Sequence, residues 1–158
     1  MTVRDGFSRF PQGVVLIAAE IAGQAQGLVA SAFTVGVSLE PPLVSVAVQR
    51  TSSTWPKLRG VRKLGVSLLG REHVPVASQL GSSQNRERRF DGVDYSVDED
   101  GALLLDASPT WLTVKVHDEL PAGDHVIVLL EVLALGDRPE REATVMHRRA
   151  FHGLTELG

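Results

Sequence analysis

Cysteine is absent from this chain of 158 residues. Without a thiol, the protein can form no disulfide, offer no cysteine nucleophile and hold neither a Cys-ligated zinc ion nor a cysteine-bound iron–sulfur cluster. Any redox chemistry must therefore take place on a bound organic cofactor. The five histidines show no metal-binding spacing such as H-E-x-x-H, so we expect no metal site.

An excess of positive charge and long apolar runs are also lacking. The formal net charge is −3, whereas nucleic-acid binders usually present a basic surface, because phosphate neutralisation supplies most of their affinity. No apolar run approaches the roughly 18–20 residues of a membrane span. The segment Met1–Phe10 has no apolar stretch typical of a secretory signal. We expect a cytoplasmic protein that binds neither nucleic acid nor membrane.

Several sequence motifs of large enzyme classes are missing as well. The chain contains no G-x-G-x-x-G and no G-x-x-x-x-G-K-[ST], so it has neither a Rossmann nor a Walker phosphate loop. It also lacks G-x-S-x-G, the nucleophile elbow of α/β-hydrolases. A nucleotide, if bound, must be held by another kind of loop.

What the chain does contain is a series of short apolar runs separated by Gly, Pro and Asp, a pattern that predicts strands. Only two short helices are expected, over Thr54–Arg59 and His73–Leu80. Many strands and few helices predict a mainly β protein, one domain over residues 1–158 with a closed or partly closed barrel. The expected strands are Val14–Ala19, a strand from near Gly27 after a connection over Glu20–Gln26, Leu43–Val48, Leu64–Leu69, Trp111–His117 and Val126–Leu135.

A loop rich in hydroxyls precedes the first expected helix. It runs Gln49-Arg50-Thr51-Ser52-Ser53-Thr54, and the unpaired amides and dipole of a helix N-terminus favour an anion there. This arrangement is typical of a phosphate site. The alternative is that Ser53 or Thr54 simply caps the helix and binds no ligand.

Small residues mark a second segment, Gly27–Thr34. Ala30, Ser31 and Ala32 leave the backbone amides open to a planar cofactor with acceptor atoms along one edge. A tightly packed strand would show the same composition, so this alternative stays open.

Two further features combine basic or titratable side chains. The turn Gly123-Asp124-His125 could expose an imidazole to a substrate, or Asp124 could merely shape the turn. Arg88–Phe90 and His147–His152 each place basic residues beside an aromatic ring, which suits a phosphate group. Solvated surface charge is the alternative for both.

Taken in order, these segments resemble the flavin reductase-like family, the small reductases of two-component flavin monooxygenases. The resemblance runs from residue 7 to residue 154. It rests on the order of segments that are individually unspecific. Those segments are Phe10–Ile17, Gly27–Phe33, Val37–Val44, Ser52–Thr54, Arg89–Phe90, Gly123–His125 and His147–Leu154.

The family implies an FMN-binding split barrel of Greek-key type, which forms a homodimer with the flavin near the subunit interface. It implies flavin-contacting residues along the first half of the chain and around Arg89, and nicotinamide-contacting residues in the second half. The implied flavin ligands are Val29, Ala30, Ser31, Ala32, Phe33, Ser38, Pro42, Gln49, Arg50, Ser52, Ser53, Thr54, Arg89 and Phe90. The implied nicotinamide ligands are His125, which is also the candidate catalytic residue, with His147, Arg148 and Arg149.

The implied activity is transfer of a hydride from NADH or NADPH to FMN, or to FAD. The implied partner for the reduced flavin is an oxygenase component. Two alternatives stay open: a flavoprotein that acts on another small molecule, and a non-catalytic flavin- or haem-binding barrel dimer. The chain departs from the family around Gly36, where one extra residue predicts a β-bulge and leaves the position of Ser38 open.

Overall fold

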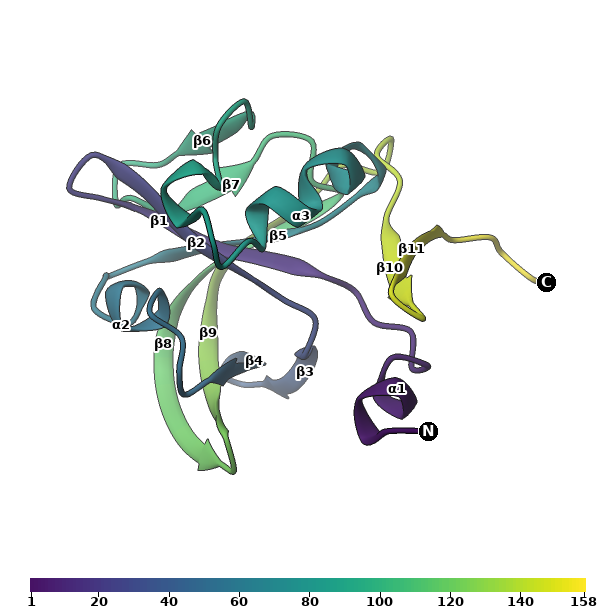
Figure 1. The fold of residues 1–158 in the computed structure, drawn as a ribbon. Coiled ribbons are helices and arrows are strands. Elements are labelled where there is room, and N and C mark those ends of the chain that lie inside the picture. Colours follow the sequence, from purple (N-terminus) through teal and green to yellow (C-terminus); the bar gives the residue numbers. More distant parts are fainter.

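The computed structural model describes residues 1–158, and antiparallel strands dominate it (Figure 1). Seven strands form one sheet in the order β2-β1-β5-β8-β9-β4-β3. The strands of this sheet are β1 (Val15–Ile21), β2 (Gln24–Ala30), β3 (Phe33–Leu39), β4 (Pro42–Gln49), β5 (Leu64–Leu68), β8 (Thr110–Ala122) and β9 (His125–Asp137). Two small hairpins pair β6 (Tyr95–Val97) with β7 (Leu103–Leu105) and β10 (Thr144–His147) with β11 (Ala150–Gly153).

The helices are short and lie outside the sheet (Figure 1). They are α1 (Val3–Phe7), α2 (Trp55–Leu58) and α3 (Ala77–Leu80), with 3₁₀ helices η1 (Arg71–Val76) and η2 (Arg86–Arg88). The predicted helix over His73–Leu80 is thus a 3₁₀ segment followed by one α-helical turn. None of the helices is long and apolar enough to cross a membrane.

The edge strands of the sheet, β2 and β3, are consecutive in sequence but pair with different partners. β2 bonds only to β1, and β3 bonds only to β4. The connection Ser31-Ala32 leads directly from one edge to the other, and the carbonyl of Ala32 accepts a bond from the amide of Ala47 on β4. The sheet therefore remains open between its two edges. This confirms the mainly β, partly closed barrel predicted from the sequence.

β1 lies between two hydrophobic clusters. Ile17 points into the larger one, which fills the curved sheet, and Leu16 points into the smaller one, which α3 and β7 cover. Both side chains are fully buried, and burial of each is worth roughly 1.5–3 kcal/mol. Because both of its faces are buried, β1 consists largely of consecutive apolar residues, as predicted for Val14–Ala19.

Element boundaries differ from the prediction where polar residues continue a strand. The turn between β1 and β2 needs only Ala22 and Gly23, both at positive φ, so the predicted connection Glu20–Gln26 was too long. β8 and β9 each run for thirteen residues, because their solvated halves pair with each other beyond the apolar core. The bulge predicted at Gly36 is confirmed, since the register of β3 against β4 shifts between Thr34 and Ser38.

Candidate functional site

A cleft of about 600 Å³ opens where β2 turns into β3. Its other walls are the end of β4, the loop before α2, and the segment from α3 to η2. The volume falls within the roughly 300–1,000 Å³ that is usual for small-molecule and cofactor sites. The residues of its wall are Leu28, Val29, Ala30, Ser31, Ala32, Ala47, Val48, Gln49, Thr51, Ser52, Ser53, Thr54, Gly81, Ser83, Arg86, Arg89 and His125.

The hydroxyl-rich loop reaches α2 with its three hydroxyls in different roles. Ser52 Oγ accepts the amide of Trp55 at 3.1 Å, so Ser52 satisfies one free N–H of the helix. Thr54 occupies the N-cap position but makes no side-chain capping bond, and Ser53 is exposed and makes no side-chain bond. The alternative that Ser53 or Thr54 caps the helix is therefore wrong.

The indole of Trp55 anchors α2 to the sheet. Its Nε1 donates to Glu119 Oε1 on β8 at 2.8 Å, and the Arg59 guanidinium pairs with the other carboxylate oxygen at 2.5 Å. Trp55 and Leu58 are both buried in the larger hydrophobic cluster. These contacts hold α2 against the sheet, and with it the end of the loop that carries the hydroxyls.

Arg89 crosses the back of the cleft and is only 8% exposed. Its Nη1 donates to the carbonyl of Gly27 at 2.6 Å and to the hydroxyl of Thr54 at 3.2 Å. Its Nε donates to the carbonyl of Ser82 at 2.8 Å. These bonds tie together three walls: β2, the loop before α2, and the segment after α3.

No carboxylate neutralises this buried charge. The cleft wall contains Arg86 and Arg89 but no Asp or Glu. Burial, and secondarily the positive charge of Arg86, lower the pKa of Arg89 from its ordinary value, although a guanidinium stays protonated in proteins. A buried cation without a counter-ion is costly. An anion in the cleft would offset that cost, so the site is electrostatically prepared for one.

Phe90, the neighbour of Arg89, belongs to the core and not to the cleft wall. Its ring packs in the smaller hydrophobic cluster and meets Tyr95 edge-on, with 5.6 Å between ring centroids. A Cβ on Gly27 would lie 2.9 Å from this ring. Gly27 therefore allows β2 to approach Phe90, which is partly buried against that cluster and does not line the cleft.

His125 begins β9 at the mouth of the cleft. Its Nδ1 lies 2.6 Å from Asp124 Oδ1, and this hydrogen bond lowers the pKa of the Asp124 carboxyl. Arg50, expected at the flavin, instead directs its Nε to the carbonyl of Gly123 at 2.7 Å. Arg50 is not among the residues of the cleft wall. Its guanidinium joins the end of β4 to the turn that carries His125.

The remaining residues implied by the resemblance do not line this cleft. Phe33 packs against the larger hydrophobic cluster. Ser38 and Pro42 lie at the opposite end of the β3–β4 hairpin from Gln49, about 23 Å along β4 at ~3.3 Å per residue. His147 ends β10, and Arg148 and Arg149 form the turn of the β10–β11 hairpin, where Arg149 pairs with Asp5 on α1.

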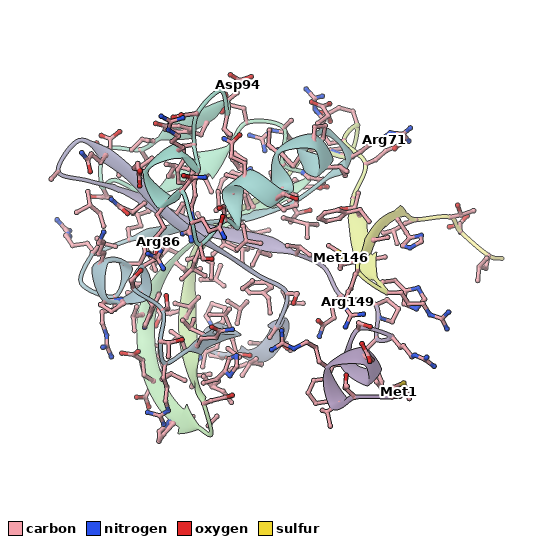
Figure 2. All side chains as sticks on the ribbon, in the orientation of Figure 1. Met1, Arg71, Arg86, Asp94, Met146 and Arg149 are labelled. Carbon is pink, nitrogen blue, oxygen red and sulfur yellow. The ribbon has the colours of Figure 1, made fainter.

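Figure 2 shows Arg86 and Arg149 on different sides of the molecule, so the C-terminal hairpin adds nothing to the cleft of its own chain. The structure thus brings ten of the predicted residues together on the cleft wall and leaves the others at several separate places. The predicted residues on the cleft wall are Val29, Ala30, Ser31, Ala32, Gln49, Ser52, Ser53, Thr54, Arg89 and His125.

Sequence reasoning missed several residues of the wall. Arg86 lies in the basic cluster before Phe90, so the charge pattern could have indicated it. Gly81 and Ser83 follow a short helix and carried no comparable signal. Leu28, Ala47, Val48 and Thr51 line the cleft because their strands end there.

Comparison with known proteins gives consistent matches over nearly the whole chain. The family model described as "Flavin reductase like domain" matches residues 7–155. The actinorhodin polyketide dimerase of Streptomyces coelicolor is 35% identical over 153 residues, which cover 96% of this chain and 85% of that protein.

Two solved structures share the fold at 28% sequence identity. The Streptomyces globisporus NADH:FAD oxidoreductase SgcE6, in complex with NAD and FAD fragments, superposes with a TM-score of 0.88 over 97% of this chain and 91% of that chain. BorF, the flavin reductase component of a bacterial two-component tryptophan halogenase, gives a TM-score of 0.85 over 98% of each chain. With its open antiparallel barrel and a family model that spans nearly all of it, this chain belongs to the flavin reductase-like family.

Proposed function

We propose that this protein is an NAD(P)H-dependent flavin reductase whose flavin, FMN or FAD, lies in the cleft between β2, β4 and α2. The observation that carries the proposal is the wall of that cleft, which holds two arginines and a loop of hydroxyls but no acid. This wall suits an anionic cofactor with a flat ring. The SgcE6 complex, with its NAD and FAD fragments, supports the same pair of ligands.

The phosphate would lie against the loop before α2. Ser53 presents a free hydroxyl there, and Arg89 supplies the positive charge behind it. Charge-assisted bonds to phosphate oxygens are about twice as strong as neutral ones. Arg86 stands at the same wall and adds to the positive potential.

The ring would lie along Val29–Ala32, where β2 leaves its pairing with β1. Backbone amides at Ser31 and Ala32 could donate to the acceptor edge of the ring, in the way oxyanion holes stabilise developing negative charge. Flavin bound there would supply the hydride acceptor. The protein would hold the nicotinamide at van der Waals distance, about 3–3.5 Å between reacting atoms. His125, at the cleft mouth, is placed to orient the nicotinamide.

We also propose that residues 1–158 act as one domain in a homodimer. Large apolar side chains on β3 and α1 are open to solvent, with Leu39 87% and Phe7 70% exposed. A second copy that covered them would remove this area from water. It could also bring Ser38, Pro42 and the segment His147–Arg149 to the flavin of the partner, since none of these residues lines the cleft of its own chain.

Reduced flavin would then pass to an oxygenase component. The cleft is open at the surface, so a flavin held there without a covalent bond could leave it. BorF, a reductase component of a two-component enzyme, supports this role.

The direct test is oxidation of NADH and NADPH by the purified protein with FMN, FAD or no flavin. We expect flavin-dependent oxidation well above the rate of the nicotinamide and flavin alone. A protein that binds flavin but oxidises neither nicotinamide would favour the non-catalytic alternative. A protein that binds no flavin would exclude both.

A further inference from the structure

The turn between β8 and β9 is fastened to β4 in a way that flavin binding does not explain. Ala122 pairs with His125, so Gly123 and Asp124 alone form the turn. Gly123 has φ +62 and Asp124 has negative φ, which matches a type II′ turn with glycine in its first central position. Such a turn could project from the sheet without further support.

Arg50 supplies that support with both its backbone and its side chain. Its amide donates to the carbonyl of Asp124 at 3.0 Å, and its Nε donates to the carbonyl of Gly123 at 2.7 Å. The preceding residue, Gln49, pairs with His125 across the ladder. The carbonyls of both turn residues are therefore bonded to Arg50, and these bonds hold His125, the next residue, in place.

The ring of His125 is fixed by its neighbour. Asp124 is 95% exposed and ionised at neutral pH, so its Oδ1 can only accept, and Nδ1 of the imidazole must carry the proton of their 2.6 Å bond. In the neutral ring, Nε2 is then an acceptor. The carboxamide of a nicotinamide offers N–H donors of the kind that such an acceptor binds.

We propose that Arg50 and Asp124 are positioning residues, which hold the imidazole of His125 at the cleft mouth with Nε2 as a hydrogen-bond acceptor for the nicotinamide. This inference rests on the proposed function for the identity of the ligand, but not for the state of the ring. It gives Arg50 a different role from the flavin contact that the resemblance implies. An exposed Asp–His pair contributes little free energy alone. The hydrogen bonds from Arg50 to the turn hold the pair in one position.

The state of the ring can be measured without any ligand. Nitrogen-15 spectra of the histidine side chains distinguish the two neutral tautomers, and the signals of His125 are those missing from a His125→Gln variant. In the wild-type protein we expect the Nδ1-protonated tautomer. In Asp124→Asn the amide can donate to Nδ1, so we expect the tautomer with the proton on Nε2. An Nε2-protonated ring in the wild type would overturn the proposal.

Kinetics then separate positioning from flavin binding. For Arg50→Gln and Asp124→Asn we expect the KM for the nicotinamide to rise about tenfold, as loss of one hydrogen bond would give, with the flavin Kd changed less than about twofold. Arg71→Gln is the matched control, because Arg71 also bonds one partner residue, Glu142, through both amide and side chain, away from the cleft.

A rise in flavin Kd for Arg50→Gln, with the nicotinamide KM unchanged, would show that Arg50 binds the flavin, and the positioning role would be wrong. If the wild-type protein oxidised no nicotinamide with any flavin, the proposed function would fail. The nitrogen-15 spectra of the wild type and Asp124→Asn would still decide whether Asp124 fixes the ring.

Discussion

Arg89 Nη1 lies 3.2 Å from the hydroxyl of Thr54, and this bond joins two segments of the cleft wall that are 35 residues apart in sequence. Both side chains are buried, at 8% and 6% exposure. The same guanidinium nitrogen also holds the carbonyl of Gly27 on β2. One arginine therefore sets the spacing between the strand proposed for the ring and the loop proposed for the phosphate.

Replacement of Arg89 by alanine should weaken flavin binding by about tenfold to a hundredfold, because a charge-assisted contact and the bond to Thr54 are both lost. Fluorescence titration with FMN and FAD measures this change. Arg88→Ala is the matched control, since Arg88 is the adjacent arginine, is exposed and lies off the cleft wall. Equal affinities for the two variants would contradict the proposed site.

Replacement of Ser53 by alanine should distinguish flavins by their phosphate. Ser53 makes no side-chain hydrogen bond within the protein, so its removal should leave stability nearly unchanged. We expect FMN affinity to fall about fivefold to tenfold, as for one hydrogen bond, and riboflavin affinity to stay constant. Titration of both flavins with both proteins tests this. A parallel loss for riboflavin would place Ser53 at the ring.

Replacement of Gly65 by alanine should destabilise the fold by about 1–3 kcal/mol or more, because overpacking a rigid site is costly. A Cβ at this position of β5 would lie 1.9 Å from the carbonyl oxygen of Leu103 on β7. Urea unfolding measures the loss. In Gly60→Ala the added Cβ would meet nothing within 4 Å, so that control should retain the wild-type free energy of unfolding.

His73 should make the free energy of unfolding depend on pH. It is buried, and its Nδ1 accepts the amide of Gly70 at 2.9 Å. Burial lowers the pKa of His73 below its ordinary value of 6.5; Glu72 opposes this shift and Arg141 adds to it.

The unfolded chain then takes up the proton first as the pH falls. The contribution of His73 is therefore complete above about pH 6.5 and is lost below it, with a slope of at most about 1.4 kcal/mol per pH unit. His73→Asn retains an acceptor near the position of Nδ1 and should flatten this slope in unfolding measured between pH 5 and pH 7. His152→Asn, at an exposed position, should leave it unchanged. The same slope in all three proteins would contradict the assignment.

Local chemistry explains why several features were predictable. The run Val14–Ala19 predicted a strand buried on both faces because its residues are apolar without alternation, and β1 lies between two clusters as expected. The extra residue at Gly36 predicted a bulge because glycine alone enters positive φ at little cost, and Gly36 has φ +74. Hydroxyls followed by Trp55-Pro56 predicted the start of α2.

Other features depended on contacts between distant segments. Nothing adjacent to Arg50 in sequence indicates that its guanidinium turns to Gly123, because that contact exists only once β4 pairs with β9. Arg89 and Phe90 are neighbours, yet the strand and loop around them send one to the cleft and the other to the core. The resemblance to the family implied the same role, contact with the flavin, for both residues.

The sequence by itself therefore determined the mainly β class, the strand segments and the order of segments that relates this chain to its family, because apolar period, glycine and proline act within a few residues. The tertiary structure decided which side chains share a site. It placed the turn Arg148–Arg149 on another side of the molecule from Arg86 (Figure 2), and Arg86 belongs to the cleft wall. The positive charge of that wall, which suits an anion, arises only when strands and loops from both halves of the chain meet.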